Sequence, residues 1–366
     1  MNLVFLIGRF PPGVYGGAEI QAEQWASRLS DRHRVTVITR QESRLDPARV
    51  VRDGFAIVRL SRSGIPLVRT WLDLRGVERT VGELGPRPDL TLAFQTFLSG
   101  YAAVRLQKRF GIPAVVWVRG EDEYRLSSPR TARISVPVWN AAAGVLVQSE
   151  ANREHVLEAV RRFRPAAEAG VAAKLAVVPN GIELPAAAAG ASRGRILAVG
   201  RLIHDKGMDV VIDAVAGMQG LLTIAGDGPE RAALEARARH HQLDVRFEGA
   251  VDRASLARLY GEASCVVLAS RRGEGLPNVL LEAFAHARAV VATPVNGVRD
   301  LVRDRVNGLL VPVEDPLALR DALARLAHER GLAARLGAAG RVAVEAFAWD
   351  HVRPQLEACL ERWARR

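Results

Sequence analysis

The chain has 366 residues, enough for two domains that each have their own hydrophobic core. Its apolar content of 49% and charged content of 25% indicate a soluble globular protein. No apolar run approaches the roughly 18 residues that span a bilayer, and the first residues lack the pattern of a signal peptide. Cys265 and Cys359 lie far apart, which argues against a disulfide framework. Together these features predict a cytoplasmic protein, at most in contact with the inner face of the cell membrane.

The formal net charge is +11, and nearly all the positive charge is arginine. Such a charge fits attraction to an anionic membrane surface or to a polyanionic ligand, or it reflects genome composition. No basic stripe interleaved with aromatic residues and no DNA-binding motif occurs, so nucleic acid is not expected as a partner. Charge alone does not decide the function.

The first half of the chain alternates short apolar runs with amphipathic stretches. Near-continuous Val, Leu and Ile runs separated by helices are typical of parallel βαβ units, which bind ligands at the carboxyl ends of their strands. The predicted strands are residues 3–7, 35–39, 56–60, 90–94, 114–118 and 144–147, and the predicted helices are 18–30, 71–84, 97–110 and 151–162. These elements predict an N-terminal domain over residues 1–182, followed by a Pro- and Gly-bearing linker over 183–194.

The second half repeats the same alternation and predicts a second domain over residues 195–347. Its predicted strands are 195–199, 221–225, 245–248, 265–269, 289–293 and 308–311, and its predicted helices are 208–216, 229–241, 253–263, 277–286, 316–327 and 332–347. Residues 348–366 form one more amphipathic helix, with Val352, Leu356, Cys359, Leu360 and Trp363 on one face. This helix either packs back on the N-terminal domain or stays on the second one.

Residues 272–285, which read RGEGLPNVLLEAFA, join a Gly-Glu-Gly turn to an apolar helix. Pro277 suits the first helical turn, because its missing N–H has no intrahelical partner there. The remaining N–H groups and the positive end of the helix make a site that phosphate would fill. Glu282 is an acid on an otherwise apolar helix and needs a hydroxyl or cation partner, such as a ribose. The alternative is a capped core helix whose glutamate faces water.

Two further loops follow strands and carry groups suited to phosphate. Residues 13–19 read GVYGGAE, and Gly16 and Gly17 would let the backbone approach a phosphate closely. In the second half, Arg201 and Lys206 bracket the loop GRLIHDKG, which either binds a diphosphate or is a solvated loop with a salt bridge to Asp205. There is no G-x-G-x-x-G motif and no Walker lysine, so neither standard nucleotide fingerprint applies.

Taken in order, the stretches GGAE, GRLIHDKG, GDGP, FEGAV and GEGLPNVLLEA resemble the retaining glycosyltransferases of family 4, which have the GT-B fold. The resemblance covers essentially the whole chain. It implies an α/β protein with two Rossmann-like parallel-sheet domains facing across a cleft. It also implies a hexosyltransferase that moves a sugar from a UDP- or GDP-sugar to a carbohydrate or lipid-linked acceptor, as in cell-surface polysaccharide or glycolipid assembly.

The resemblance further implies roles for individual residues. The implied donor-binding set is Gly16, Gly17, Arg201, Lys206, Val251, Gly275, Leu276, Pro277, Asn278 and Glu282. In this set Arg201 and Lys206 take the diphosphate, Glu282 takes the ribose hydroxyls, and Val251 lies by the base. Glu274 and the backbone of residues 275–278 meet the transferred sugar and the phosphate, while the two glycines close over the phosphates from the first domain.

The chemistry of this assignment requires positive charge near the leaving diphosphate. Arg201, Lys206 and a helix N-terminus stabilise the departing charge more in the transition state than in the ground state. No Asp-x-Asp occurs, so neither a metal ion nor another cofactor is expected. The acidic run of residues 121–123 is interpreted as a strand-end loop rather than a metal site.

One position departs from the family pattern. Many members carry a histidine after the strand that corresponds to residues 114–118, and Arg119 stands there in this chain. An arginine cannot act as a general base at neutral pH. Arg119 is therefore expected to bind an acidic acceptor or the leaving phosphate, while Glu121 or Asp122 serves the acceptor. The predicted catalytic residues are Glu274, Arg119 and Asp122.

The acceptor site is the least specified part. Residues 59–75 alternate arginines with apolar residues, which suits either a lipid-linked or membrane-surface acceptor or an ordinary surface helix with its loop. Two other classes of protein remain open, namely a GT-B-like epimerase or phosphorylase and a non-catalytic sugar-nucleotide binding protein. A nicotinamide-dependent enzyme is disfavoured by the missing glycine fingerprint.

Overall fold

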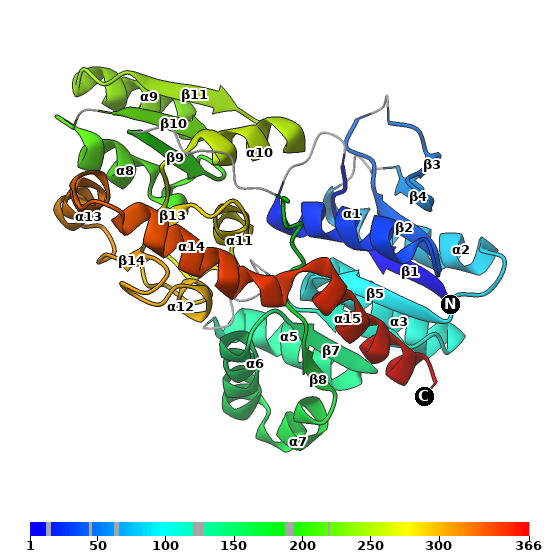
Figure 1. Ribbon diagram of the computed structural model, residues 1–366. Coiled ribbons are helices and arrows are strands. Elements are labelled where there is room, and N and C mark those ends of the chain that lie inside the picture. The colour runs from blue at the N-terminus through cyan, green and yellow to red at the C-terminus, as the bar shows by residue number, and fades with distance from the viewer. Residues whose placement is uncertain are drawn as a thin grey trace. The chain divides into compact units, whose positions relative to one another are not determined.

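A computed structural model describes residues 1–11, 16–43, 46–61, 66–119, 128–186, 194–218 and 220–365, with the backbone alone for 66–72. The chain forms two compact units (Figure 1). Unit 1 comprises Met1–Pro179 together with Arg353–Arg366, and unit 2 comprises Asn180–Val352. The division between Pro179 and Asn180 lies just before the linker predicted at residues 183–194.

Unit 1 is built on an eight-stranded sheet in the order β3-β4-β2-β1-β5-β6-β7-β8. All strand pairs are parallel except β3 with β4. The strands are β1 (Asn2–Leu6), β2 (Arg34–Arg40), β3 (Arg49–Arg52), β4 (Phe55–Leu60), β5 (Leu90–Phe94), β6 (Ala114–Trp117), β7 (Gly144–Val147) and β8 (Leu175–Val177). The helices are α1 (Gly17–Leu29), α2 (Pro66–Glu83), α3 (Tyr101–Phe110), α5 (Pro129–Ala141), α6 (Glu150–Phe163) and α7 (Glu168–Ala172). Because β1 lies between β2 and β5, the strand order reverses there, as in a Rossmann-like sheet.

Unit 2 is built on a six-stranded, wholly parallel sheet in the order β11-β10-β9-β12-β13-β14. Its strands are β9 (Arg195–Val199), β10 (Leu221–Ala225), β11 (Val245–Gly249), β12 (Cys265–Leu268), β13 (Ala289–Ala292) and β14 (Leu309–Leu310). Its helices are α8 (Met208–Val215), α9 (Arg231–His240), α10 (Arg253–Glu262), α11 (Asn278–Ala285), α12 (Val298–Leu301), α13 (Pro316–His328) and α14 (Leu332–Val344). The order again reverses at the first strand, β9. The predicted α/β fold with two Rossmann-like parallel sheets is therefore confirmed.

Burial explains why the strands are almost continuously apolar. In unit 2, side chains of α8, α9 and α13 form one core with the sheet, and side chains of α10 and α11 form a second core with it. Strands between two helical layers have no face in water, so apolar residues occupy every position rather than every second one. This is the pattern from which the strands were predicted.

The predicted elements did not include the short helices α7 and α12, and they also missed β3, β8 and α5, each for a local reason. Strand β3 is a four-residue edge strand reading RVVR, too short and too charged to stand out. It pairs with β4 through a turn at Asp53 and Gly54, whose φ values of 50° and 82° suit a two-residue hairpin. Strand β8 has only three residues, and helix α5 carries Pro137 in its interior.

The C-terminal helix α15 (Trp349–Ala364) contributes its residues from Arg353 onward to unit 1. Leu356, Leu360 and Trp363 are fully buried on one face. The Trp363 ring lies directly against Gly144, where an added Cβ would come within 2.3 Å of it. The Arg353 guanidinium also contacts the Asp31 carboxylate, at 2.9 and 2.5 Å. None of the helices in the described part of the chain is long and apolar enough to cross a membrane.

The packing of Trp363 predicts a large loss of stability on truncation. We expect Trp363→Ala to lower the free energy of unfolding by about 3–5 kcal/mol, because it removes a fully buried ring and leaves a cavity. Arg365→Ala, at an exposed position of the same helix end, is the matched control. Urea unfolding followed by circular dichroism measures both. Equal midpoints for the two variants would contradict the packing described for α15.

Candidate functional site

The carboxyl ends of β9 and β12 bring separate parts of the sequence together in unit 2. In a doubly wound sheet, ligands bind where the strand order reverses, outside these strand ends. The loop after β9 carries Arg201 and Lys206, and the loop after β12 carries Ser270 and Glu274. The two loops therefore face the place where such a sheet binds its ligand.

Lys206 and Glu274 form the charged centre of this site. Lys206 Nζ lies 2.5 Å from Glu274 Oε1, and the buried Ser270 hydroxyl donates to the same oxygen at 2.6 Å. The backbone N–H of Glu274 also donates to the carbonyl of Asn296 at 2.8 Å. A buried carboxylate thus holds the ammonium group that was predicted to bind phosphate. Ser270 was missed by sequence reasoning, although its place directly after a predicted strand was a signal.

Arg201 is exposed on the loop after β9, and no ion pair recorded within the described ranges involves it. This loop packs tightly on the loop after β10, where Leu202 N–H donates to the Asp227 carbonyl at 2.9 Å. Gly226 has a φ of 144°, and a Cβ there would lie 1.8 Å from the Gly200 carbonyl oxygen. The GDGP stretch therefore lets the two loops approach closely.

The start of α11 differs from its prediction in one detail. Pro277 is the N-cap residue, with φ −72° and ψ 110°, and the helix begins at Asn278. Placing Pro277 inside the first helical turn was therefore wrong: its ψ is extended rather than helical. Asn180, which sequence reasoning missed, donates from Nδ2 to the Leu276 carbonyl at 3.1 Å and to Asn278 Oδ1 at 2.7 Å. These bonds fix the loop of residues 275–278 that was predicted to meet sugar and phosphate.

Glu282 lies partly buried on α11, beside the buried ring of Tyr260. Burial raises the pKa of the Glu282 carboxyl from 4.5 to about 7, while interactions with Tyr260 and Arg253 act in the opposite direction. The Tyr260 ring in turn stacks on His286, with centroids 5.5 Å apart. Glu282 therefore changes charge near neutral pH, which matters for any hydroxyl that it accepts from.

Three other residues of the predicted donor-binding set, Val251, Gly16 and Gly17, lie apart from the Lys206–Glu274 pair in the sequence. Val251 follows β11 and packs, partly buried, against the core that includes α10 and α11. In unit 1, Gly16 is the N-cap of α1 and Gly17 its first residue, and the carboxylate of Glu19 lies against Gly16. Whether these two glycines close over a donor phosphate stays a prediction.

Arg119, the residue in place of the family histidine, is buried in unit 1 with 2% of its surface exposed. Its guanidinium carbon lies 3.9 Å from the centroid of the Trp117 ring and 5.3 Å from that of Phe94. The charge is thus held over aromatic faces, a favourable cation–π arrangement. Asp122 and Glu121 lie outside the described residues, so the roles predicted for all three stay predictions.

The arginine-rich stretch 59–75 is not a uniform basic face. Arg59 is only 6% exposed, and its Nη2 donates to the Pro11 carbonyl at 3.1 Å. Of the arginines in this stretch, Arg59 therefore cannot contact a membrane-surface acceptor as predicted, because its guanidinium is used inside the fold. Arg62 and the side chain of Arg69 lie outside the described residues, while Arg75 is exposed on α2.

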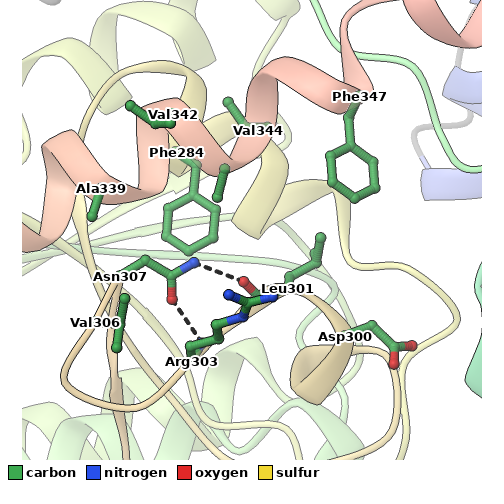
Figure 2. A pocket seen from close by; sticks show the side chains of 11 residues that line it. Phe284, Asp300, Leu301, Arg303, Val306, Asn307, Ala339, Val342, Val344 and Phe347 are labelled. Atoms are coloured by element: carbon green, nitrogen blue, oxygen red, sulfur yellow. Dashed lines mark hydrogen bonds between the residues drawn. The ribbon is translucent and has the colours of Figure 1, made fainter.

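Two other features of the described residues bear on ligands. No group of three or more His, Cys, Asp or Glu side chains gathers there as metal ligands, and residues 121–123 lie outside the described ranges. Metal independence stays a prediction. A pocket of about 430 Å³ lies among α11, α12 and α14 (Figure 2), lined in part by Phe284, Arg303 and Val342. None of the predicted donor-binding residues lines it.

This geometry defines a class of protein: two Rossmann-like units, one of which presents a lysine, a buried glutamate and a helix start at its switch point. The sequence profile described as "Glycosyltransferase Family 4" matches residues 15–185, and that described as "Glycosyl transferases group 1" matches residues 193–329. The chain therefore belongs to the glycosyltransferases of family 4.

Individual relatives agree with this family. The chain is 38% identical over 163 residues to a D-inositol 3-phosphate glycosyltransferase of Xylanimonas cellulosilytica, covering 42% of this chain and 39% of that protein. It is 29% identical over 303 residues to a GDP-mannose-dependent alpha-mannosyltransferase of Mycobacterium tuberculosis, covering 76% and 73%. The chain thus spans about two fifths of the length of the first relative and nearly three quarters of the second.

A solved structure supports the fold. The crystal structure of Anabaena HepE in complex with UDP and glucose superimposes with a TM-score of 0.82 over 99% of both chains, at 20% identity. At this identity the likeness concerns the fold, which is the GT-B arrangement of two Rossmann-like domains expected from the sequence.

The raised pKa of Glu282 gives a testable dependence of stability on pH. Between about pH 5 and pH 8 the unfolded chain loses the proton of Glu282 before the folded chain does, so this group makes folding less favourable as pH rises. Glu282→Gln has no carboxyl group at this position and therefore does not show this fall in stability as pH rises. We expect the free energy of unfolding of the variant, relative to the parent, to gain up to about 3 kcal/mol over this range.

Urea unfolding at both pH values measures the gain, with Glu230→Gln, a partly exposed position of unit 2, as the control. If the free energies of unfolding of the parent and of Glu282→Gln differed by the same amount at pH 5 and at pH 8, Glu282 would not titrate in this range.

Proposed function

We propose that the protein is a retaining, metal-independent glycosyltransferase that moves a sugar from a nucleotide-diphosphate sugar to a carbohydrate or lipid-linked acceptor. The observation that carries the proposal is the Lys206–Glu274 pair with Ser270 at the switch point of β9 and β12. A cation there lies where a parallel sheet binds the diphosphate of a nucleotide. A buried carboxylate beside it suits the hydroxyls of a sugar.

Donor binding then exchanges partners within the site. The Lys206 ammonium leaves Glu274 for a phosphate oxygen, and Glu274 becomes free to accept hydrogen bonds from sugar hydroxyls. Exposed Arg201 adds a second cation on the same loop. When the anomeric bond breaks, negative charge grows on the leaving diphosphate, and both cations stabilise it more than they stabilise the bound donor.

The donor is proposed to be a UDP- or GDP-sugar. The name of the Mycobacterium tuberculosis relative specifies GDP-mannose, and the Anabaena structure contains UDP and glucose. UDP- and GDP-sugars differ in the base, beside which Val251 is proposed to lie. A binding screen with UDP- and GDP-sugars decides between them.

The acceptor is proposed to be a carbohydrate or a lipid-linked sugar, as in the assembly of cell-surface glycans or glycolipids. The name of the Xylanimonas relative specifies an inositol phosphate, which is an anionic acceptor. The net charge of +11 in this chain would favour an anionic acceptor or a membrane surface that carries one. Peripheral membrane contact belongs to the same proposal and is tested with anionic liposomes at low salt.

A second candidate function is a non-catalytic sugar-nucleotide binding protein. Arg119, which replaces the family histidine and is buried on Trp117, favours it. Tight binding of a nucleotide-diphosphate sugar with neither transfer nor hydrolysis would support this candidate against the enzyme.

The donor site predicts a strong effect of two substitutions. Lys206→Ala and Glu282→Ala are each expected to weaken binding of the best nucleotide-diphosphate sugar by roughly 10- to 150-fold, because each removes a charge-assisted hydrogen bond of about 1.5–3 kcal/mol. Isothermal titration calorimetry measures the dissociation constants. Lys108→Ala, which removes an exposed lysine of unit 1, is the control and should bind like the parent. If both site variants also bound like the parent, the donor site would lie elsewhere.

Metal independence predicts that transfer persists in EDTA. Because Arg201, Lys206 and the start of α11 are proposed to neutralise the leaving diphosphate, chelation should leave the initial rate within about twofold of the untreated enzyme. Product formation from the identified donor measures the rate. Loss of activity in EDTA with recovery in Mg²⁺ would show instead that a divalent ion carries that charge.

A further inference from the structure

Arg271 lies on the loop after β12 and makes several hydrogen bonds to the loop after β9, although it has no role in the proposed donor site. Its backbone N–H donates to the Asp205 carbonyl at 2.8 Å, and its Nη1 donates to the His204 carbonyl at 2.6 Å. The guanidinium also binds Asp209 in a bidentate way, at 2.8 and 2.7 Å, and Nε donates to Glu314 Oε1 at 2.8 Å. The Arg271 side chain is only 11% exposed, and its paired bonds to Asp209 are partly buried, whereas Glu314 is exposed.

Two of the four residues that accept hydrogen bonds from Arg271 belong to the short turn that carries Lys206. This turn, His204–Lys206, has no side chain of its own that caps it. Two of its three carbonyl groups point at Arg271, and Asp209 lies in the first turn of the helix that follows. Hydrogen bonds from Arg271, acting against burial, also hold the pKa of Asp209 below its usual range, so the carboxylate stays charged at neutral pH.

Close packing leaves this turn little room to move on the other side. Gly207, which ends the turn, has a φ of 63°, and a Cβ there would lie 2.1 Å from the Ala269 carbonyl oxygen. The end of β12 therefore supports the turn from one direction and Arg271 holds its carbonyls from another. Two further side-chain contacts of the turn are the ion pair between Arg272 Nε and Asp205 Oδ1, at 3.3 Å, and the contact between Lys206 and Glu274. A bound diphosphate would have to replace the second of these.

We propose that Arg271 is a positioning residue for donor binding, which holds the His204–Lys206 turn so that the Lys206 ammonium stays directed at the β-phosphate after Glu274 releases it. This inference rests on the proposed function. Arg271 need not touch the donor, because its guanidinium is already occupied by Asp209, Glu314 and His204. A lysine cannot reproduce the arrangement, since an ammonium group lacks the planar fork that binds several acceptors at once.

Nucleotide binding gives a measurement that a merely structural residue would not affect selectively. With the base that the parent prefers, either UDP and UMP or GDP and GMP are titrated. We expect Arg271→Ala to weaken diphosphate binding by roughly 10- to 100-fold and monophosphate binding by less than about threefold, because only the diphosphate carries the β-phosphate. Equal weakening of both nucleotides would overturn the proposal.

A double-mutant cycle with Lys206→Ala tests whether Arg271 acts through that lysine. In the Lys206→Ala background, Arg271→Ala is expected to change diphosphate affinity by less than about threefold. Full additivity of the two effects would overturn the proposal, because it would mean that Arg271 acts independently. Arg271→Lys is expected to stay impaired, and full recovery in that variant would show that charge alone matters.

The chain offers a matched control in a second arginine, on α9, that pairs with an aspartate of the same helix, α8, as Arg271 does. Arg237 binds Asp213 of α8 through Nε at 2.6 Å and through Nη2, but it makes no recorded bond to the Lys206 turn within the described ranges. Arg237→Ala should therefore leave the ratio of diphosphate to monophosphate affinity unchanged. A change equal to that of Arg271→Ala would count against the proposal, since it would trace the effect to any lost ion pair on α8.

Failure of this inference can be told apart from failure of the proposed function. A parent that binds neither UDP nor GDP refutes the donor site itself. A different result would refute only the role of Arg271. In that case the parent binds a diphosphate more tightly than the monophosphate, Lys206→Ala loses this preference, and Arg271→Ala keeps it. Thermal unfolding of each variant verifies that the fold is intact, and Arg271→Lys replaces Arg271→Ala if the latter does not fold.

Discussion

The ion pair between Lys206 and Glu274 is the interaction on which the rest of the site depends. Two opposite charges can stay in a mostly buried place only if each is satisfied, and here the Ser270 hydroxyl shares the carboxylate oxygen that the ammonium binds. The pair joins the loop after β9 to the loop after β12. The Arg271 contacts and the Pro277 N-cap of α11 involve the same two loops.

This ion pair keeps the Lys206 ammonium in a fixed position before any ligand binds. A lysine without a partner at a strand end could bind other acceptors, whereas Glu274 keeps the Lys206 ammonium in place until an anion competes for it. The phosphates of a donor are a stronger set of acceptors than one carboxylate oxygen. In the proposed function the same carboxylate then accepts hydrogen bonds from sugar hydroxyls, so that one exchange of partners prepares the site for both the phosphates and the sugar of the donor.

In unit 1, two arginines are buried inside the fold instead of lying on a loop at a strand end. Arg119 lies over the aromatic faces of Trp117 and Phe94, in the cluster that also holds Phe5 and Trp25. Arg59 is likewise buried and bonded to backbone carbonyls. A strongly basic composition therefore does not by itself make a basic surface, because part of the arginine serves inside the fold.

The sequence by itself determined the two parallel sheets, because strands buried on both faces must be apolar throughout. It also indicated Lys206 and Glu274, on loops that follow those strands, and Glu282, on an otherwise apolar helix, as candidate site residues. It did not reveal β3, β8 or α5, whose short, charged or proline-bearing segments carry no clear periodicity. Only the tertiary structure decided that Lys206 pairs with Glu274, that Arg271 holds the Lys206 turn, and that Arg59 and Arg119 are buried. The Lys206 and Arg271 contacts join residues more than 60 positions apart in sequence, and their partners are set by strand order, which local patterns do not encode.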